Sequence, residues 1–257
     1  MPLFFRFYLV VLLLLFPPFL FAKQDLRVGV GNFPPFFIEE GEKGLFLDIT
    51  KAVFKLMPEY DATFTFMSNS KLLHEINDKT GDIDVACNIF SSSKTDAYLS
   101  EPLFRYTDVA VSKKENNFII NEITDLKDRS ISAYQGAVDL LGDEFKQMAQ
   151  KNERYTEHGL PSKTTLLLAM GKKDVRIGDV FIFLYDLSSY KYKKRGINAN
   201  DFNIHRLWSD VFTHMAFKDE SIRDQANKAI LEIQSNGVLQ QIYKEYEVYL
   251  RFEESAQ

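Results

Sequence analysis

The sequence predicts an α/β fold of two lobes rather than a single sheet. Segments with strand and helix patterns alternate along the chain, as expected of β-α-β units. The polar stretch Lys113–Asn117 falls where a crossover between lobes is expected. The chain has 257 residues, and a chain of this size lies near the upper limit for one hydrophobic core, which favours two.

The composition is that of an acidic globular protein. Lys and Arg number 31 against 36 Asp and Glu, so the net charge is -5, which argues against a nucleic-acid-binding protein. The only cysteine, Cys87, excludes an intramolecular disulfide and a thiolate metal cluster. The four histidines show no H-x-x-x-H spacing. We therefore expect neither a metal nor a cofactor.

The amino terminus has the pattern of a secretory signal peptide. Residues Phe7–Ala22 form an uncharged run of 16 residues with one basic residue on each side. This run is shorter than the ~20 residues of a membrane-spanning helix, and Pro17-Pro18 would break a helix. We expect residues 1–22 to direct export to the periplasm and to be removed. An uncleaved anchor is the alternative, because Leu20 is not a small residue.

Strand and helix patterns follow one another through the first half of the chain. Alternating apolar residues predict a strand at 26–30, and the two prolines of Asn32–Phe36 predict a stiff loop after it. Apolar residues at helical spacing predict a helix at 49–57, with Asp48 as its cap and Pro58 after its end. Further predicted segments are strands at 63–67, 81–89, 109–113 and 130–133, and a polar helix at 71–77.

A glycine loop begins the second half. Gly136 stands between a predicted strand and a helix running to Phe145, so backbone N–H groups are exposed there and an anion can bind. Pro161 predicts the start of a helix that Gly171 ends, and Lys172–Leu184 is predicted to form a turn and a buried strand. The last predicted segments are a strand at 213–217 and helices at 222–233 and 238–246.

Seven short motifs occur in an order typical of one protein family. They are Phe33-Pro34-Pro35-Phe36, Gly44–Asp48, Asp82-Ile83-Asp84-Val85, Ser100-Glu101-Pro102-Leu103-Phe104, Asp125–Gly136, Gly171–Asp179, and Met215–Phe217 with Gly237. Each motif is weak alone. Together they make the chain resemble the bacterial extracellular solute-binding proteins, family 3, the periplasmic receptors of amino-acid-type ABC importers. The resemblance covers nearly all of the chain after residue 22.

The resemblance implies a type II periplasmic binding protein fold. In this fold two α/β lobes are joined by two crossing strands, and they close by a hinge motion over a ligand held between them. We expect lobe 1 to contain residues 23–112 and 212–257, and lobe 2 residues 113–211. The resemblance also implies a small-molecule ligand, the membrane permease of an ABC importer as partner, a monomer, and no catalytic residue.

The sequence departs from the family pattern where a ligand carboxylate is normally held. Typical members use the arginine of a T-x-x-R motif, because a guanidinium matches both carboxylate oxygens. Here Ser93 stands at the threonine and Asp96 at the arginine, and Ala137 replaces the hydroxyl residue that normally follows Gly136. Lys94 would supply the missing positive charge only if the alignment that places Asp96 at the arginine position is shifted. We therefore expect a cationic or neutral ligand that is not an ordinary α-amino acid.

The resemblance assigns the amine end of the ligand to Asp179, five residues after Asp174 as in the family. Phe33 would stack on the ligand, although an aromatic residue beside Pro-Pro can equally belong to the core. Asp179 can equally be a helix cap, Asp96 a solvated loop residue and Gly136 an ordinary turn. The candidate ligand-binding residues are Phe33, Asn88, Ser93, Asp96, Gly136 and Asp179.

Two other functions stay open on the sequence alone. The chain also resembles periplasmic cyclohexadienyl dehydratases of the same fold, in which a carboxylate acts as general acid, so an enzyme is one alternative. A receptor that senses a ligand without transporting it is the other. No acid-base set and no activated nucleophile stands out, and we therefore favour a binding protein over an enzyme.

Overall fold

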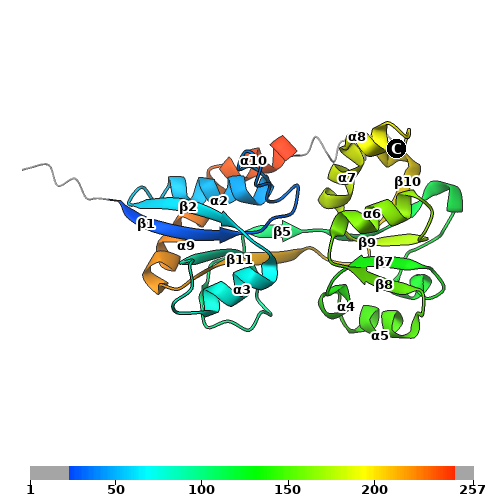
Figure 1. Ribbon diagram of the computed structural model, residues 1–257, viewed down its shortest axis with the longest axis horizontal. Coiled ribbons are helices and arrows are strands. Elements are labelled where there is room, and N and C mark those ends of the chain that lie inside the picture. Colours follow the sequence, from blue (N-terminus) through cyan, green and yellow to red (C-terminus); the bar gives the residue numbers. More distant parts are fainter. Residues whose placement is uncertain (1–22, 247–257) are drawn as a thin grey trace, which may run out of the picture.

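The structure, a computed structural model, describes residues 23–246 and shows two α/β lobes that lie side by side (Figure 1). Each lobe is built on one mixed β-sheet. The predicted signal peptide, residues 1–22, lies outside the described residues. Among the helices of residues 23–246, none combines the length and the apolar character needed to cross a bilayer.

The first lobe contains a six-stranded sheet with strand order β2-β1-β3-β11-β4, in which β5 also pairs with β11. Its strands are β1 (Gln24–Val30), β2 (Tyr60–Phe66), β3 (Val85–Phe90), β4 (Tyr98–Leu99), β5 (Phe104–Tyr106) and β11 (Val211–Phe217). Its helices are α2 (Leu45–Lys55), α3 (Asn69–Asn77), α9 (Glu220–Ser235) and α10 (Val238–Tyr246). Strand β1 is parallel to β2 and β3, whereas β11 is antiparallel to β3, so a late segment of the chain lies inside this sheet.

Helix α2 begins earlier than the sequence indicates. It starts at Leu45 after Gly44, whose φ of 130° suits glycine and whose Cβ, if it had one, would lie 2.5 Å from the Phe36 carbonyl oxygen. Asp48 is therefore a residue of the first turn and not the cap. Its carboxylate accepts a hydrogen bond from the Tyr246 hydroxyl, which ties α10 to α2.

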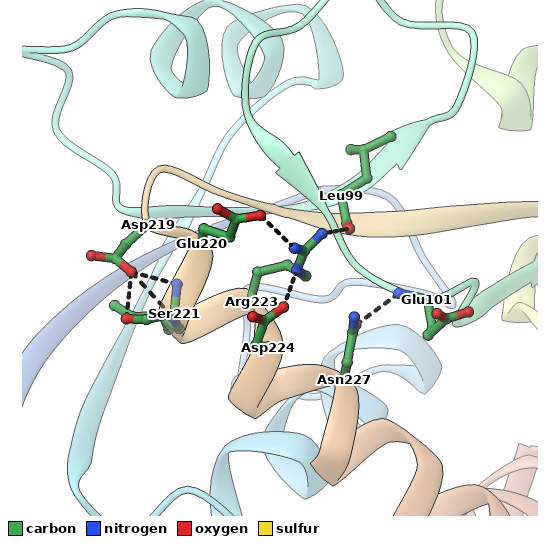
Figure 2. Close-up of polar contacts among 9 residues, drawn as sticks. Leu99, Glu101, Asp219, Glu220, Ser221, Arg223, Asp224 and Asn227 are labelled. Carbon is green, nitrogen blue, oxygen red and sulfur yellow. Dashed lines mark hydrogen bonds and ion pairs between the residues drawn. The ribbon is translucent and has the colours of Figure 1, made fainter.

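Helix α9 holds the segment that leads into β5 (Figure 2). The Asn227 side-chain oxygen accepts a hydrogen bond from the Glu101 backbone N–H at 2.8 Å, and Arg223 donates to the Leu99 carbonyl at 3.3 Å. Asp219 caps the helix by accepting from two backbone N–H groups of its first turn. The chain is thus fixed to the first lobe just before it leaves for the second.

The second lobe contains a five-stranded sheet with strand order β10-β6-β9-β7-β8. Its strands are β6 (Asp108–Lys113), β7 (Ile131–Tyr134), β8 (Tyr155–His158), β9 (Val175–Asp179) and β10 (Phe202–His205). Its α-helices are α4 (Ala137–Leu140), α5 (Asp143–Lys151), α6 (Pro161–Ala169), α7 (Val180–Ser188) and α8 (Tyr190–Lys193), with 3-10 turns at Lys114–Asn116, Ile123–Leu126 and Ala199–Asp201. Strands β7, β8 and β9 are parallel, and β6 is antiparallel to β9.

The chain passes twice between the lobes, and the two passages lie side by side. The first runs from β5 to β6 through Thr107, and the second runs from β10 to β11. β5 and β11 pair antiparallel, with Tyr106 opposite Val211. The Thr107 hydroxyl donates a 2.7 Å hydrogen bond to the Asp210 carboxylate, which links the passages where they cross.

The expected crossover at Lys113–Asn117 is not where the chain leaves the first sheet. This segment forms the end of β6 and a 3-10 turn, both in the second lobe. Because β6 already belongs to the second sheet, we propose that the first passage lies at Thr107 instead of the expected boundary at 113.

Two predicted elements of the second lobe are wrong in type or extent. Residues 180–184, predicted as strand, belong to α7, because the side chain of Asp179 ends β9 by capping the helix. The predicted helix up to Phe145 is two helices, α4 and α5, because Gly142 with φ 90° interrupts it. An apolar run such as 180–184 has no period that separates a buried strand from a buried helix.

Candidate functional site

The central strands of both sheets end at the crossing. Asp179, the last residue of β9, accepts a hydrogen bond from the Thr107 backbone N–H at 2.9 Å. Asn88, near the end of β3, accepts one from the Tyr106 hydroxyl at 2.8 Å. Ligands of α/β proteins bind outside the carboxyl ends of the strands. The crossing therefore brings two such edges together and is the candidate site.

Asp179 is a buried carboxylate held by backbone N–H groups. Its side chain is the N-cap of α7, accepting from Ile182 N–H at 3.1 Å as well as from Thr107 N–H, and only 3% of the residue is exposed. Burial raises the pKa of Asp179 to about 7, and the nearby carboxylate of Asp108 acts in the same direction. Asp179 is thus a helix cap, as the sequence allowed. The resemblance assigns a ligand contact to the same residue.

A second buried carboxylate stands beside the first. Asp108 lies directly opposite Asp179 in the β6–β9 ladder, and Tyr134 donates a 3.0 Å hydrogen bond to it. Burial raises the pKa of Asp108 to about 6, and the bond from Tyr134 opposes this rise. Sequence reasoning missed Asp108, because its pairing with Asp179 depends on strand register.

A fully buried arginine lies behind these carboxylates. Arg176 is 1% exposed, and it donates to the backbone carbonyls of Gly178 and Asp179 at 2.9 and 3.0 Å and to the Thr164 hydroxyl at 3.2 Å. Its charge lowers the pKa values of Asp179, Asp108 and Asp186, against the stronger effect of burial. A charged residue in the apolar run 175–177 was the sequence signal for it.

Asn88 joins three elements at the first-lobe edge. Its side-chain oxygen accepts from the hydroxyls of Tyr106 and Thr213, at 2.8 and 2.9 Å, and its amide donates to Asn69 at 3.3 Å. Asn88 is 2% exposed and has φ 68°, a left-handed conformation that asparagine tolerates. This predicted site residue therefore fixes the first crossing strand to the end of β3.

Replacing Asn88 by alanine should lower the free energy of unfolding by about 2–4 kcal/mol, because two buried hydroxyls lose their acceptor and alanine is strained at positive φ. Urea denaturation measures the loss. Asn88→Gly is the matched variant: it removes the same acceptor without the backbone strain, and should be less destabilised than Asn88→Ala by about 1 kcal/mol. Equal stability of both variants and the parent would contradict the role of Asn88.

Aromatic rings line the crossing on the first-lobe side. Phe36 is buried, stacks on Phe46 at 4.0 Å between ring centroids, and meets the edges of Tyr106 at 5.1 Å and Phe33 at 6.0 Å. Phe181 of the second lobe lies 6.3 Å from Phe36. Phe33 itself is half-buried, so it is both packed on the core and partly available to a ligand.

The turn at Gly136 is filled by a side chain of the protein. Gly136 has φ 90° and precedes α4. Its N–H donates to Glu157 at 2.8 Å, the Val138 N–H donates to the same carboxylate at 2.9 Å, and the Tyr155 hydroxyl donates at 2.7 Å. Glu157 is a single acid in a short polar strand, and no pattern in the sequence marks it as a partner of this turn.

Ser93 and Asp96 lie on the first lobe, beyond the end of β3. Ser93 is in the turn after this strand, where its N–H bonds the Phe90 carbonyl. Asp96 is exposed, in a segment tied to α3 through hydrogen bonds of Asn77 with Lys94 and Thr95. Asn88 and Asp179 thus contact the neighbouring residues Tyr106 and Thr107 of the crossing, and Phe33 packs on Phe36. The ligand contacts assigned to these residues, and to Ser93 and Asp96, stay predictions.

The described residues offer little for nucleophilic or metal chemistry. Cys87 is buried, and burial raises the pKa of its thiol to about 12. Between residues 23 and 246, His, Cys, Asp and Glu form no group with the arrangement of a metal site.

Known proteins match nearly the whole chain. The family model of the bacterial extracellular solute-binding proteins, family 3, matches residues 26–248. The L-cystine-binding protein TcyJ of Bacillus subtilis (strain 168) is 23% identical over 233 residues, which cover 87% of this chain and 84% of that protein. The arginine-binding periplasmic protein of Mannheimia haemolytica is 26% identical over 236 residues, covering 87% and 91%.

Solved structures share the fold. An ancestral arginine-binding protein bound to glutamine has a TM-score of 0.66 and 24% identity, covering 88% of this chain and 98% of that one. The probable amino-acid ABC transporter extracellular-binding protein ytmK from Bacillus subtilis has a TM-score of 0.69 and 22% identity, covering 88% and 99%. The predicted two-lobed type II periplasmic binding protein fold is confirmed by these likenesses and by the family match.

The family match also decides between a binding protein and an enzyme. The family is one of solute-binding proteins, and the curated relatives are binding proteins, so the chain is a solute-binding receptor and not an enzyme. The protein belongs to the bacterial extracellular solute-binding proteins, family 3.

Proposed function

We propose that the protein captures a small, amine-bearing solute between its two lobes for an ABC importer. The observation that carries this proposal is the pair of buried carboxylates at the crossing, Asp108 and Asp179. Their hydrogen-bond donors are neutral: one tyrosine hydroxyl and two backbone N–H groups. Because a carboxylate has about four acceptor positions, both can still accept hydrogen bonds from an ammonium group. A cation placed there would offset the cost of burying them.

The crossing is also the natural hinge. Thr107 donates a hydrogen bond to Asp179 through its backbone N–H and another to Asp210 through its hydroxyl. The candidate ligand-binding residue Asp179 and the two passages between the lobes therefore meet at Thr107. A ligand that contacts both lobes would stabilise a closed orientation, and that orientation is what a permease can distinguish from the empty form.

The aromatic rings suit the same ligand class. Phe33 is partly exposed, and Tyr106 lies between Phe36 and Phe90, stacked on the latter at 6.1 Å between ring centroids. The faces of such rings attract cations. An ammonium or guanidinium group would therefore meet carboxylates on one side and ring faces on the other.

The place of action follows from the family and the amino terminus. The family is described as extracellular, and one curated relative is a periplasmic arginine-binding protein. Residues 1–22 have the composition of a signal peptide. We propose a periplasmic monomer that is released by cleavage after Ala22 and works with a membrane permease.

Native mass spectrometry of the protein purified from periplasm tests the proposal. We expect an added mass that corresponds to one amine-bearing solute and that disappears after unfolding and refolding. The refolded protein should regain it from a panel of biogenic amines and basic amino acids, measured by thermal shift. A protein that retains no solute and is stabilised by no member of the panel would contradict the proposal.

A further inference from the structure

The first passage between the lobes changes from one lobe to the other within a single peptide link. Tyr106 is held by the first lobe, because it lies in β5 and its hydroxyl donates to Asn88 at 2.8 Å. Thr107 is held by the second lobe: its N–H donates to the Asp179 carboxylate at 2.9 Å, and its carbonyl accepts from the Val180 N–H at 3.0 Å. The backbone rotations that can turn this passage are therefore those between Tyr106 and Thr107.

The second passage is anchored almost as closely. Trp208 packs on the second lobe, where its ring meets that of Phe145 edge to face at 5.5 Å between centroids. Val211 is the first residue of β11, which lies in the first sheet. Ser209 and Asp210, both exposed, connect these two anchors. This passage therefore turns at Ser209 and Asp210.

One hydrogen bond, which we call the latch, joins the turning points of the two passages. The Thr107 hydroxyl donates it to a carboxylate oxygen of Asp210 at 2.7 Å. Thr107 is held by the second lobe, whereas Asp210 adjoins β11 of the first, so the latch spans two bodies that would move relative to each other. Its acceptor is charged, which makes it stronger than a bond between neutral groups. The latch therefore stabilises the lobe orientation of Figure 1.

Arg105 offers the same carboxylate a second partner. Its Nε lies 3.8 Å from the other carboxylate oxygen of Asp210, too far for a hydrogen bond, and its guanidinium lies over the ring of Tyr243 at 5.1 Å. This Nε is buried, and within residues 23–246 it has no hydrogen-bond partner. Arg105 belongs to β5, so it stays with the first lobe when the second turns. A small movement of Asp210 away from Thr107 would close the gap to Arg105.

We propose that Asp210 is a positioning residue of the hinge: bound to Thr107 it holds the lobes in the orientation of Figure 1, and bound to Arg105 it holds them in a second orientation. This inference goes beyond the proposed function, because it concerns the lobe orientation without a ligand. A carboxylate that exchanges one donor for another gives the hinge two preferred positions. Asp179 bonds the N–H of the same Thr107, so a change at the candidate ligand contact acts directly on the latch.

The distance between the lobes tests the proposal on the ligand-free protein. Spin labels at Lys55→Cys in α2 and Lys151→Cys in α5 occupy exposed positions, one on each lobe, and the single native cysteine, Cys87, is buried. Pulsed electron paramagnetic resonance gives the distribution of distances between the two labels. The parent protein should show one main population, which is the orientation that the latch stabilises.

Variants of Thr107 separate the hydroxyl from the backbone. Thr107→Val keeps the shape of the side chain and both backbone bonds but has no hydroxyl, so the ratio of the parent orientation to the second one should fall about tenfold. Thr107→Ser keeps the hydroxyl and should give the parent distribution. The matched control is Thr65→Val, which removes an exposed hydroxyl of β2 and should also leave the distribution unchanged.

Variants of the other two residues test the exchange of partners. Arg105→Met alone should keep the parent distribution, because the latch is intact. In Thr107→Val with Arg105→Met the carboxylate has neither donor, so the second population should disappear and the distribution should broaden. Asp210→Ala should give the same broad distribution, and because Asp210 is exposed this variant serves if Thr107→Val does not fold.

Two results would overturn the inference. One is a distance distribution of Thr107→Val that superimposes on that of the parent, and the other is a shift that is the same with and without Arg105. A variant that is less stable but has unchanged distances would show that the bond only supports the fold. The proposed function fails separately: a protein that binds no amine, including agmatine, which is arginine without its carboxylate, contradicts that function, whereas the distances still decide on the latch.

Discussion

Replacing Arg176 with methionine is expected to destabilise the protein by about 3–5 kcal/mol at pH 8, because a buried cation is removed while the carboxylates around it remain. Arg176 is fully buried, and its charge acts on Asp179, Asp108 and Asp186. Methionine preserves much of the apolar volume, so the loss reports on charge and hydrogen bonding more than on packing. Urea denaturation monitored by circular dichroism gives the free energy of unfolding.

Two further measurements separate the charge effect from a packing effect. Asp186→Asn in the Arg176→Met background should recover about 1 kcal/mol, since the charge of a half-buried carboxylate that has lost its neighbouring cation disappears with it. The loss should also be smaller at pH 5, where the buried carboxylates bind protons more readily. A loss that is independent of pH and unaffected by Asp186→Asn would show that Arg176 acts only through its volume.

Replacing Asp179 with asparagine is expected to weaken the binding of a monovalent organic cation about 30- to 1000-fold, which corresponds to the roughly 2–4 kcal/mol expected for losing one partner of a buried charge pair. Asparagine keeps the shape of the side chain and can still cap α7 with its oxygen. The matched control is Asp61→Asn, which changes the net charge equally at an exposed position of β2. Unchanged affinity in Asp179→Asn would place the ligand elsewhere.

The pH dependence of binding gives an independent check on Asp179. Burial raises its pKa to about 7 in the ligand-free protein, and a bound cation requires the ionised form. The affinity of the parent protein for agmatine should therefore rise about tenfold per pH unit below pH 7 and level off above it. Asp179→Asn should lose most of this rise. An affinity that does not change between pH 5 and pH 8 would contradict the proposed contact.

Stability without ligand should change with pH in the opposite direction. The folded-state pKa values of Asp108 and Asp179, about 6 and about 7, lie above the value of about 3.9 for an unfolded aspartate. The folded protein thus binds more protons than the unfolded chain between about pH 4 and pH 7, and the stability contributed by these groups is lost as the pH rises through this range. Asp179→Asn should flatten the curve of unfolding free energy against pH.

The sequence determined most of the fold because apolar patterning and motif order act locally. The strand at 26–30 and the helices at 222–233 and 238–246 were predicted from periodicity, and the structure contains all three. The run at 180–184 was predicted wrongly, since the side chain of Asp179 and not the pattern of the run decides where strand gives way to helix.

Site residues were predictable only where the local sequence around a single residue identifies it. Asp179 and Phe33 lie within motifs, whereas Asn88 does not; Asn88 and Asp179 each accept a hydrogen bond from the first crossing segment, and Phe33 packs on Phe36. Asp108 and Glu157 depend on which strands pair and in what register, and a single sequence does not show this. The partners of Asp108 and Glu157 thus depend on contacts between segments that are far apart in the sequence, which no motif contains.

The position of β11 in the first sheet fixes an order of assembly during synthesis. Strand β11 pairs with β3, β4 and β5, yet it is translated after the whole second lobe. A nascent chain can close the sheet of residues 108–205 while the earlier sheet still lacks an inner strand. The amino-terminal lobe cannot complete its sheet until residue 217 has been synthesised and has left the ribosome, so the second lobe can fold before the first.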